Sequence, residues 1–321
     1  MIINRKETWG NLSYDTKNHI FGYDLEGDVS EEPFVSKPMV LNVDLTFKCN
    51  MNCVHCVAKD TAKVLGGVEN ADLKITHELI EKINSSDFVV VVITGGEPLL
   101  KDYEDRFMNL INGLKNKGIV IDTNGSILPS ERLLRILRIK EALIRVSWDI
   151  PNPKEEYKLR KYPHEMYGDK DEYIREKMRV IRYLRDNGIK IAIQSVLHGQ
   201  NYGDPTFYRF PAKLKQLGVD RWYIQRFIPS YKKIDDRRYL LSIGEYDNAI
   251  RKVTSISYDY DIKCYTKKDR RHNSVFILVK NGEIYTQSDD VPGKKICLGK
   301  IGEIKYYFEF VSSSEHSVRY Y

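Results

Sequence analysis

Three cysteines lie close together, at Cys49, Cys53 and Cys56, in the sequence Cys-Asn-Met-Asn-Cys-Val-His-Cys. Thiolates are soft ligands that select zinc, copper(I) or iron–sulfur clusters. Structural zinc sites take four ligands, usually as two separated pairs, and no second cysteine pair follows in this sequence. Three thiolates on one loop fit a cubane iron–sulfur cluster better, with three irons anchored and the fourth open to another ligand. A zinc site and a chance grouping are the alternatives.

The segment around these cysteines alternates between strand-like and helix-like patterns. Runs rich in β-branched residues predict strands over 40–47, 88–94, 119–123, 143–148, 189–197 and 222–228. Amphipathic stripes predict helices over 74–84, 103–117, 130–140, 171–187 and 207–217. This alternation predicts βαβ units with right-handed crossovers around a parallel sheet. Residues 38–230 are too few for an eight-unit barrel of about 250 residues, so we expect an α/β fold with an open six-unit (β/α)6 partial TIM barrel.

Two further regions flank this barrel. Residues 1–37 are polar and aromatic, and they predict an N-terminal hairpin or extension. Residues 231–321 predict a small C-terminal α+β region, with a helix over 241–258 and a hairpin around Asn281-Gly282. Alternation along the sixth strand predicts that one pair of side chains faces the substrate, Tyr223 with Gln225 or Ile224 with Arg226.

Glycines and polar residues lie at the ends of several predicted strands. Gly95, Gly96 and Glu97 end the second strand, Asn124 follows the third, and Ser147 ends the fourth. Glycines let a backbone approach a neighbouring group closely, and a carboxylate at this edge can accept from a ligand. Ordinary Gly and Asn turns are the alternative interpretation.

The Cys-x3-Cys-x2-Cys loop after the first strand of an α/β barrel resembles the radical S-adenosylmethionine (SAM) superfamily over about residues 38–230. The resemblance implies one [4Fe–4S] cluster, held by Cys49, Cys53 and Cys56, with SAM bound at the open iron. It also implies that one electron splits SAM into methionine and a 5′-deoxyadenosyl radical, which takes a hydrogen atom from the substrate. Cluster potentials reach about −700 mV, so a flavodoxin or ferredoxin is the expected electron donor.

The same resemblance implies SAM contacts at individual positions. Gly95, Gly96 and Glu97 match the motif that binds the methionyl ammonium, and Asn124 matches an element near the ribose. The other matches are Ser147 for a SAM-contacting hydroxyl, Arg160 for the SAM carboxylate, and His55 for a position near the adenine that is usually aromatic. Arg160 as an exposed helix residue and Asp149 as a loop cap are the plain alternatives. Asn201 matches a common family asparagine without an implied role.

The substrate is less defined than the cofactors. Segments 4–10, 281–284 and 297–301 resemble the peptide-modifying branch of the superfamily, which implies a peptide or peptide-like substrate. Relatives in that branch hold auxiliary clusters, but the C-terminal region has only Cys264 and Cys297, and two thiolates alone cannot anchor an ordinary cluster. These two thiols are instead candidate hydrogen donors, with inert thiols as the plainer interpretation. The alternatives are a small molecule, such as a nucleotide or cofactor precursor, and a non-enzymatic zinc- or cluster-stabilised binding protein.

Composition excludes several other classes of protein. The 321 residues include 51 Lys and Arg against 45 Asp and Glu, with 42% hydrophobic and 30% charged residues, which are ordinary globular values. The longest apolar run, 88–93, is far shorter than the roughly 20 residues of a membrane span. With no apolar signal segment at the start, we expect a cytoplasmic protein without a membrane partner. The net charge of +6 is mild and scattered, so nucleic acid is not an expected partner.

Overall fold

The structure is a computed structural model that describes residues 1–7, 10–25, 39–56, 58–59, 62, 67, 72–163, 167–227, 238–267, 275–279, 282–287 and 295–303. Its strands are β1 (Ile2–Glu7), β2 (Gly10–Asp15), β3 (Ile20–Leu25), β4 (Val40–Thr46), β5 (Asn52–Cys53), β6 (Val90–Gly95), β7 (Gly118–Thr123), β8 (Leu143–Ser147), β9 (Arg160–Lys161), β10 (Lys190–Leu197), β11 (Arg221–Arg226), β12 (Lys263–Lys267), β13 (Val275–Val279), β14 (Glu283–Gln287) and β15 (Lys295–Lys300). Its helices are α3 (His77–Asn84), the 3-10 turn η1 (Lys101–Tyr103), α4 (Glu104–Gly113), α5 (Glu131–Ile139), α6 (Pro153–Leu159), α7 (Lys170–Asp186), α8 (Pro205–Tyr208), α9 (Phe210–Gln216) and α10 (Ile243–Asp259).

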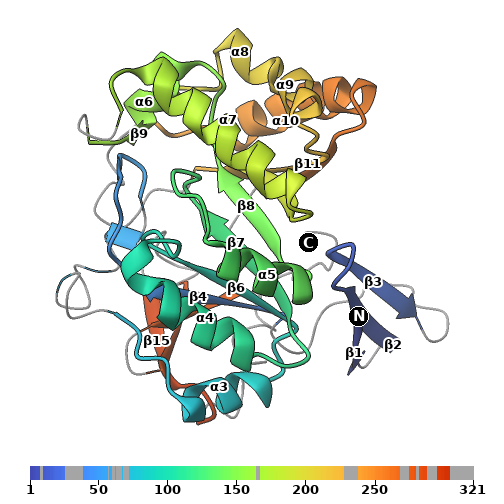
Figure 1. The fold of residues 1–321 in the computed structure, drawn as a ribbon. Helices are drawn as coiled ribbons and strands as arrows, with labels where there is room; N and C mark the ends of the chain where they lie inside the picture. The colour runs from blue at the N-terminus through green and yellow to red at the C-terminus, as the bar shows by residue number, and fades with distance from the viewer. Residues whose placement is uncertain are drawn as a thin grey trace.

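One large sheet organises the molecule (Figure 1). In the described part of the chain it has ten strands, in the order β12-β11-β10-β8-β7-β6-β4-β13-β14-β15. The seven strands from β4 to β12 pair in parallel, and β13 pairs in parallel with β4 on the other side. The predicted α/β class with a parallel sheet is therefore confirmed, and each of the six predicted strands is present.

The sheet extends beyond the six predicted units at both ends. Strand β12 follows α10 and pairs with β11, which adds a seventh parallel strand of the βα series. The predicted hairpin is present as β13 and β14, although its turn residue Asn281 lies outside the described residues, and β15 extends it. The described strands from both sides of residue 230 thus share one sheet, and the domain boundary placed there stays a prediction.

The outer face of the parallel strands packs against the helices. Leu41, Val91, Ile144 and Ile193 are fully buried in the core that these helices share. Polar side chains start several helices, as N-cap residues should: Thr76 caps α3, Ser130 caps α5, Asn152 caps α6, Asp169 caps α7 and Ser242 caps α10. None of the described helices is both long and apolar enough to cross a membrane.

The inner face is covered at one end by a separate antiparallel sheet, β1-β2-β3, which contains the predicted N-terminal hairpin as β2 and β3. Figure 1 shows these dark-blue strands standing apart from helices α8–α10. Leu12 and Tyr14 pack with Val90, Val120 and other inner-face residues in a second buried cluster. Inner-face side chains nearer the carboxyl ends of the strands are polar. The cysteine loop follows the carboxyl end of β4, so it lies toward the same edge of the sheet as these polar groups.

Candidate functional site

The Cys loop, residues 48–56, leaves the carboxyl end of β4 and includes the short strand β5. All three of its cysteines are partly buried. Burial, together with the charges of Glu97 and of the other two cysteines, raises the pKa of Cys49 to about 12. The three sulfurs thus lie within electrostatic range of one another, so holding them together as thiolates requires a positive partner.

The donor chemistry of this loop fits an iron–sulfur cluster. Among the described side chains, no three His, Cys, Asp or Glu groups converge on one metal ion. The thiolates of a cubane each bind a different iron, so they do not need such convergence. Three soft thiolates on one loop are a donor set that suits such a cluster.

Gly95 and Gly96 hold the start of the Cys loop. A Cβ on Gly95 would overlap the Thr46 carbonyl, and a Cβ on Gly96 would overlap the Lys48 carbonyl. The close approach permits two backbone hydrogen bonds, from Gly96 N to Thr46 O at 2.6 Å and from Glu97 N to Lys48 O at 2.9 Å. In this structure the glycines are needed because another backbone segment, the end of β4 and the start of the Cys loop, lies against them.

Glu97 is fully buried and ties the ends of β6 and β7 together. Its Oε1 accepts from Thr123 Oγ1 at 2.8 Å and from Leu99 N at 3.0 Å, and its Oε2 accepts from Asn124 N at 2.7 Å. Burial raises the pKa of Glu97 to about 7, although these hydrogen bonds favour the carboxylate. Asn124 Nδ2 then donates to Asn50 Oδ1 at 2.8 Å and lies 3.8 Å from Cys49 Sγ. Both residues therefore position the Cys49 end of the loop.

Asp72 also holds this end of the loop, although it lies in no recognisable sequence motif. Its carboxylate accepts from Thr46 Oγ1 at 2.8 Å, from Phe47 N at 3.3 Å and from Tyr103 Oη at 2.7 Å. The guanidinium of Arg106 lies 3.3 Å from the same carboxylate. One acidic side chain thereby links the end of β4, where the chain enters the Cys loop, to η1 and α4.

Asp72→Ala should loosen the Cys loop, because three hydrogen-bonding groups lose their acceptor. Each buried group left unpaired costs about 1–3 kcal/mol. We expect a lower free energy of unfolding in urea and a lower iron content after anaerobic reconstitution. Asp105→Ala is the matched control, because the Asp105 side chain is 90% exposed and pairs with the exposed Arg132. Equal iron content in the two variants would contradict the role assigned to Asp72.

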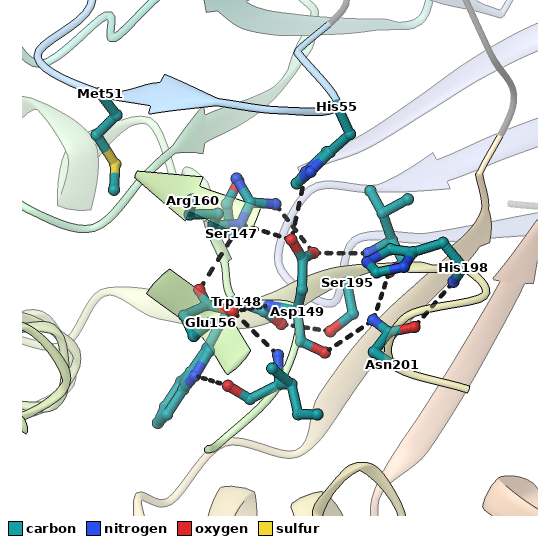
Figure 2. A network of polar contacts seen from close by, with 12 residues as sticks. Met51, His55, Ser147, Trp148, Asp149, Glu156, Arg160, Ser195, His198 and Asn201 are labelled. Atoms are coloured by element: carbon teal, nitrogen blue, oxygen red, sulfur yellow. Dashed lines mark hydrogen bonds and ion pairs between the residues drawn. The ribbon is translucent and has the colours of Figure 1, made fainter. Parts of the chain in front are cut away.

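Asp149 is the centre of a buried polar network at the other end of the loop (Figure 2). Its Oδ2 lies 2.9 Å from Arg160 Nε and 3.3 Å from His55 Nε2. Its Oδ1 accepts from Arg160 Nη2 at 3.0 Å and from Val196 N at 2.8 Å. Burial alone would raise the pKa of Asp149, but Arg160, His55 and the Val196 hydrogen bond outweigh it and hold the pKa at about 2.

A second ion pair, between Glu156 and Lys177, supports the backbone of Asp149. Glu156 Oε2 accepts from Asp149 N at 2.9 Å, and Glu156 Oε1 lies 3.0 Å from Lys177 Nζ. Lys177 also donates to the carbonyl of Ser147 at 2.8 Å. Sequence analysis missed Lys177, although a lysine within the apolar stripe of α7, between Ile174 and Val180, is the signal that could have identified it. Figure 2 shows Glu156 beside Asp149 and Arg160.

Arg160 and His55, both predicted as SAM contacts, lie in this network. Arg160 is opposite Cys53 in the antiparallel pair formed by β5 and β9, and Val54 N donates to Leu159 O at 2.9 Å. Burial raises the pKa of Cys53 to about 11, Arg160 opposes this effect, and Asp149 adds to it. The plain alternative for Arg160, an exposed arginine on a helix, is therefore wrong: Arg160 is 8% exposed and follows α6.

Ser147 and Asn201 have different surroundings. Ser147 is partly exposed at the end of β8, on the inner face and beside Gln194 of β10 in register. Asn201 is fully buried, where it accepts from His198 N at 2.8 Å and donates to Val196 O at 2.8 Å. Asn201 thus orders the loop after β10, and Ser147 presents a partly exposed hydroxyl at the carboxyl end of β8.

Burial along β11 shows which of its side chains lie on the inner face of the sheet. Ile224 is buried in the helix-facing core, so Tyr223 and Gln225 lie on the inner face. The Tyr223 ring stacks on Tyr265 with ring centroids 4.7 Å apart, and Arg145 lies over Tyr223 at 5.4 Å. Arg145 makes a bidentate ion pair with Asp122, at 2.6 and 2.9 Å. The predicted pair of Tyr223 and Gln225 is the one that faces inward.

The two candidate hydrogen donors, Cys264 and Cys297, lie on different strands of the sheet. Cys264 lies opposite Trp222 in register and packs on the helix-facing core, near the Ser257 side chain. Cys297 is exposed on β15, opposite Tyr285. Cys264 therefore points away from the inner face, and Cys297 lies on β15, the strand at the opposite end of the sheet order from β12.

We expect the two thiols to differ in chemical modification. Burial raises the pKa of Cys264, which lowers its thiolate fraction, whereas Cys297 is exposed. Brief treatment of the folded protein with iodoacetamide should label Cys297 and spare Cys264, as read by peptide mass spectrometry. Labelling of both at the same rate in the native protein, and not merely after unfolding, would show that Cys264 faces an open site.

Comparison with known proteins gives a family match that covers this site. Residues 43–210 match the model described as the radical SAM superfamily. The AdoMet-dependent heme synthase of Nitratidesulfovibrio vulgaris is 24% identical, over 66% of this chain and 56% of that protein. The GTP 3′,8-cyclase of Aquifex aeolicus is 26% identical, over 60% of this chain and 58% of that protein. The chain thus matches less than two thirds of the length of these relatives.

A solved structure shares the fold over nearly the whole chain. Streptococcus suis SuiB bound to its precursor peptide SuiA superposes with a TM-score of 0.64 and 13% identity. The match covers 98% of this chain and 88% of that one. At this identity the likeness concerns the fold.

Proposed function

Because the chain belongs to the radical SAM superfamily, we propose that it binds one [4Fe–4S] cluster through Cys49, Cys53 and Cys56 and cleaves SAM reductively. The observation that carries this proposal is the Cys loop, whose three partly buried sulfurs lie at the carboxyl edge of a parallel sheet. Ligands of α/β folds bind at that edge. Two sets of contacts fix the loop, one at Cys49 and one at Cys53.

The bound cluster and SAM would supply the electron transfer and the radical that abstracts hydrogen from the substrate. The residues of the chain position these groups. We propose that Ser147 contributes a hydroxyl, Asn124 an amide and His55 a ring to SAM binding. We propose that Glu97 binds the SAM ammonium and that Arg160 binds the SAM carboxylate. Each side chain would bind SAM while it also keeps its contact with the protein.

Anaerobic reconstitution tests the proposal directly. We expect about four irons and four sulfides per chain, and 5′-deoxyadenosine after addition of SAM and dithionite. One zinc per chain with no 5′-deoxyadenosine would instead support the non-enzymatic binding protein. A flavodoxin or ferredoxin is proposed as the natural donor, and it should replace dithionite in the same assay.

We propose a peptide or peptide-like substrate. The segments before and after the barrel resemble the peptide-modifying branch, and the fold follows peptide-bound SuiB over 98% of the chain. The inner face offers polar and aromatic groups for such a substrate, including Arg145, Gln194 and Tyr223. The probe is a short precursor peptide encoded beside the gene, and its addition should increase 5′-deoxyadenosine formation.

A small-molecule substrate is the second candidate. It is favoured by the relatives named GTP 3′,8-cyclase, one of which, from Helicobacter pylori, matches over 86% of this chain and 83% of its own length at 25% identity. GTP, deuterated on the ribose, should then pass deuterium to 5′-deoxyadenosine. Transfer from GTP and not from the peptide would replace the peptide proposal.

A further inference from the structure

We propose that Asp149 is a positioning residue for the cluster ligands, and that it fixes the Cys53–Cys56 half of the Cys loop through Arg160 and His55. The inference rests on the proposed function in one respect, the cluster held by the three cysteines. It assigns to Arg160 and His55 a role in holding the loop before SAM binds.

The geometry connects the carboxylate of Asp149 to two residues that are each next to a cluster ligand. His55 is adjacent to Cys56 in the chain, and its Nε2 lies 3.3 Å from Asp149 Oδ2. Arg160 is opposite Cys53 in the β5–β9 pair, and its guanidinium lies 2.9 and 3.0 Å from the two oxygens of Asp149. Movement of Asp149 would therefore displace two ligands at once.

Asp149 is itself rigidly held by the sheet. It is fully buried, and Val196 N of β10 donates to its Oδ1 at 2.8 Å. Its backbone N–H donates to Glu156, which Lys177 pairs at 3.0 Å. Desolvating a buried network of charges is expensive, so the network is weak evidence for stability. We infer that its effect is to hold Asp149 in one geometry.

Charge gives Asp149 a second effect on the cluster. Asp149 and Arg160 both act electrostatically on the Cys53 sulfur, in opposite directions. A negative charge this close to a cluster disfavours the more negative, reduced state. Asp149→Asn removes that charge with little change in shape, so the midpoint potential should become more positive.

The test compares the parent protein with Asp149→Asn and His55→Phe, each reconstituted anaerobically without SAM. Loss of a group that orients metal ligands typically weakens metal binding about tenfold or more. Both variants should therefore release iron at about tenfold lower EDTA concentration than the parent. Both should also change the EPR spectrum of the dithionite-reduced cluster, and Asp149→Asn should raise the midpoint potential. His55→Phe keeps the Asp149–Arg160 pair, so it decides the question if Asp149→Asn does not fold.

Asp122→Asn is the matched control, because Asp122 pairs bidentately with Arg145 in the same sheet. It should keep the parental EDTA sensitivity, spectrum and potential. Parental values in both test variants, or an equal loss in Asp122→Asn, would overturn the inference while leaving the proposed function intact. A parent protein that takes up no cluster would overturn the proposed function instead. SAM is left out so that contact of His55 with adenine does not affect the readout.

Discussion

Cys53→Ala should abolish cluster binding and SAM cleavage together. Cys53 lies in the middle of the Cys loop, in strand β5, and its removal leaves two thiolates, which do not hold an ordinary cluster. The variant should show background iron and sulfide, no cluster absorbance, and no 5′-deoxyadenosine with SAM and dithionite. This is the largest effect that we expect from any single substitution.

The control for this experiment is Cys297→Ala, which removes an exposed thiol on β15. It should load the same amount of iron as the parent protein. SAM cleavage at the parental rate by Cys53→Ala would contradict the assignment of the three cysteines. Loss of cluster in Cys297→Ala would show that iron is bound elsewhere.

Gly96→Ala should prevent the Cys loop from forming, although it adds one methyl group. The new Cβ would overlap the carbonyl of Lys48 and approach the carbonyl carbon of Phe47 to 2.8 Å. These are backbone atoms, which cannot rotate away as a side chain can. Overpacking of this kind costs about 1–3 kcal/mol, occasionally more. Urea unfolding should show the loss of stability, and the reconstituted variant should hold little iron.

Gly244→Ala is matched to Gly96→Ala, because nothing lies within 4 Å of a Cβ at that position in α10. Alanine favours helix over glycine by about 0.8–1.0 kcal/mol, so this variant should be as stable as the parent or more so. If Gly96→Ala binds a full cluster and unfolds at the parental urea concentration, Gly96 does not hold the loop.

The parallel strands could be predicted because their sequences are continuous apolar runs, such as Val90 to Ile93, which suit strands buried on both faces. Strand β12 was missed because Lys263 and Lys267 give it a charged, edge-like sequence. Its parallel pairing depends on β11, far away in sequence. The cysteine motif identified the family, which the match over 43–210 confirms.

The partners of the site residues could not be read from the sequence in the same way. Asp149 and Arg160 are separated by a helix, and only the fold shows that they pair. Asp72 lies in no motif, and its contacts come from the end of β4 and the next residue, from η1 and from α4. The direction of the Cys264 side chain was also undetermined, so Cys264 and Cys297 were both kept as candidate hydrogen donors on the strength of being the remaining thiols.

Strand β4, which leads into the Cys loop, pairs on one side with β13. A ribosome adds about 5–20 residues per second, so β13 emerges roughly 10–50 s after β4. Until then one side of β4 has no partner from this sheet, and its unpaired backbone groups can accept a strand from another chain. The nascent protein therefore carries its three reactive thiols beside an open sheet edge throughout that interval.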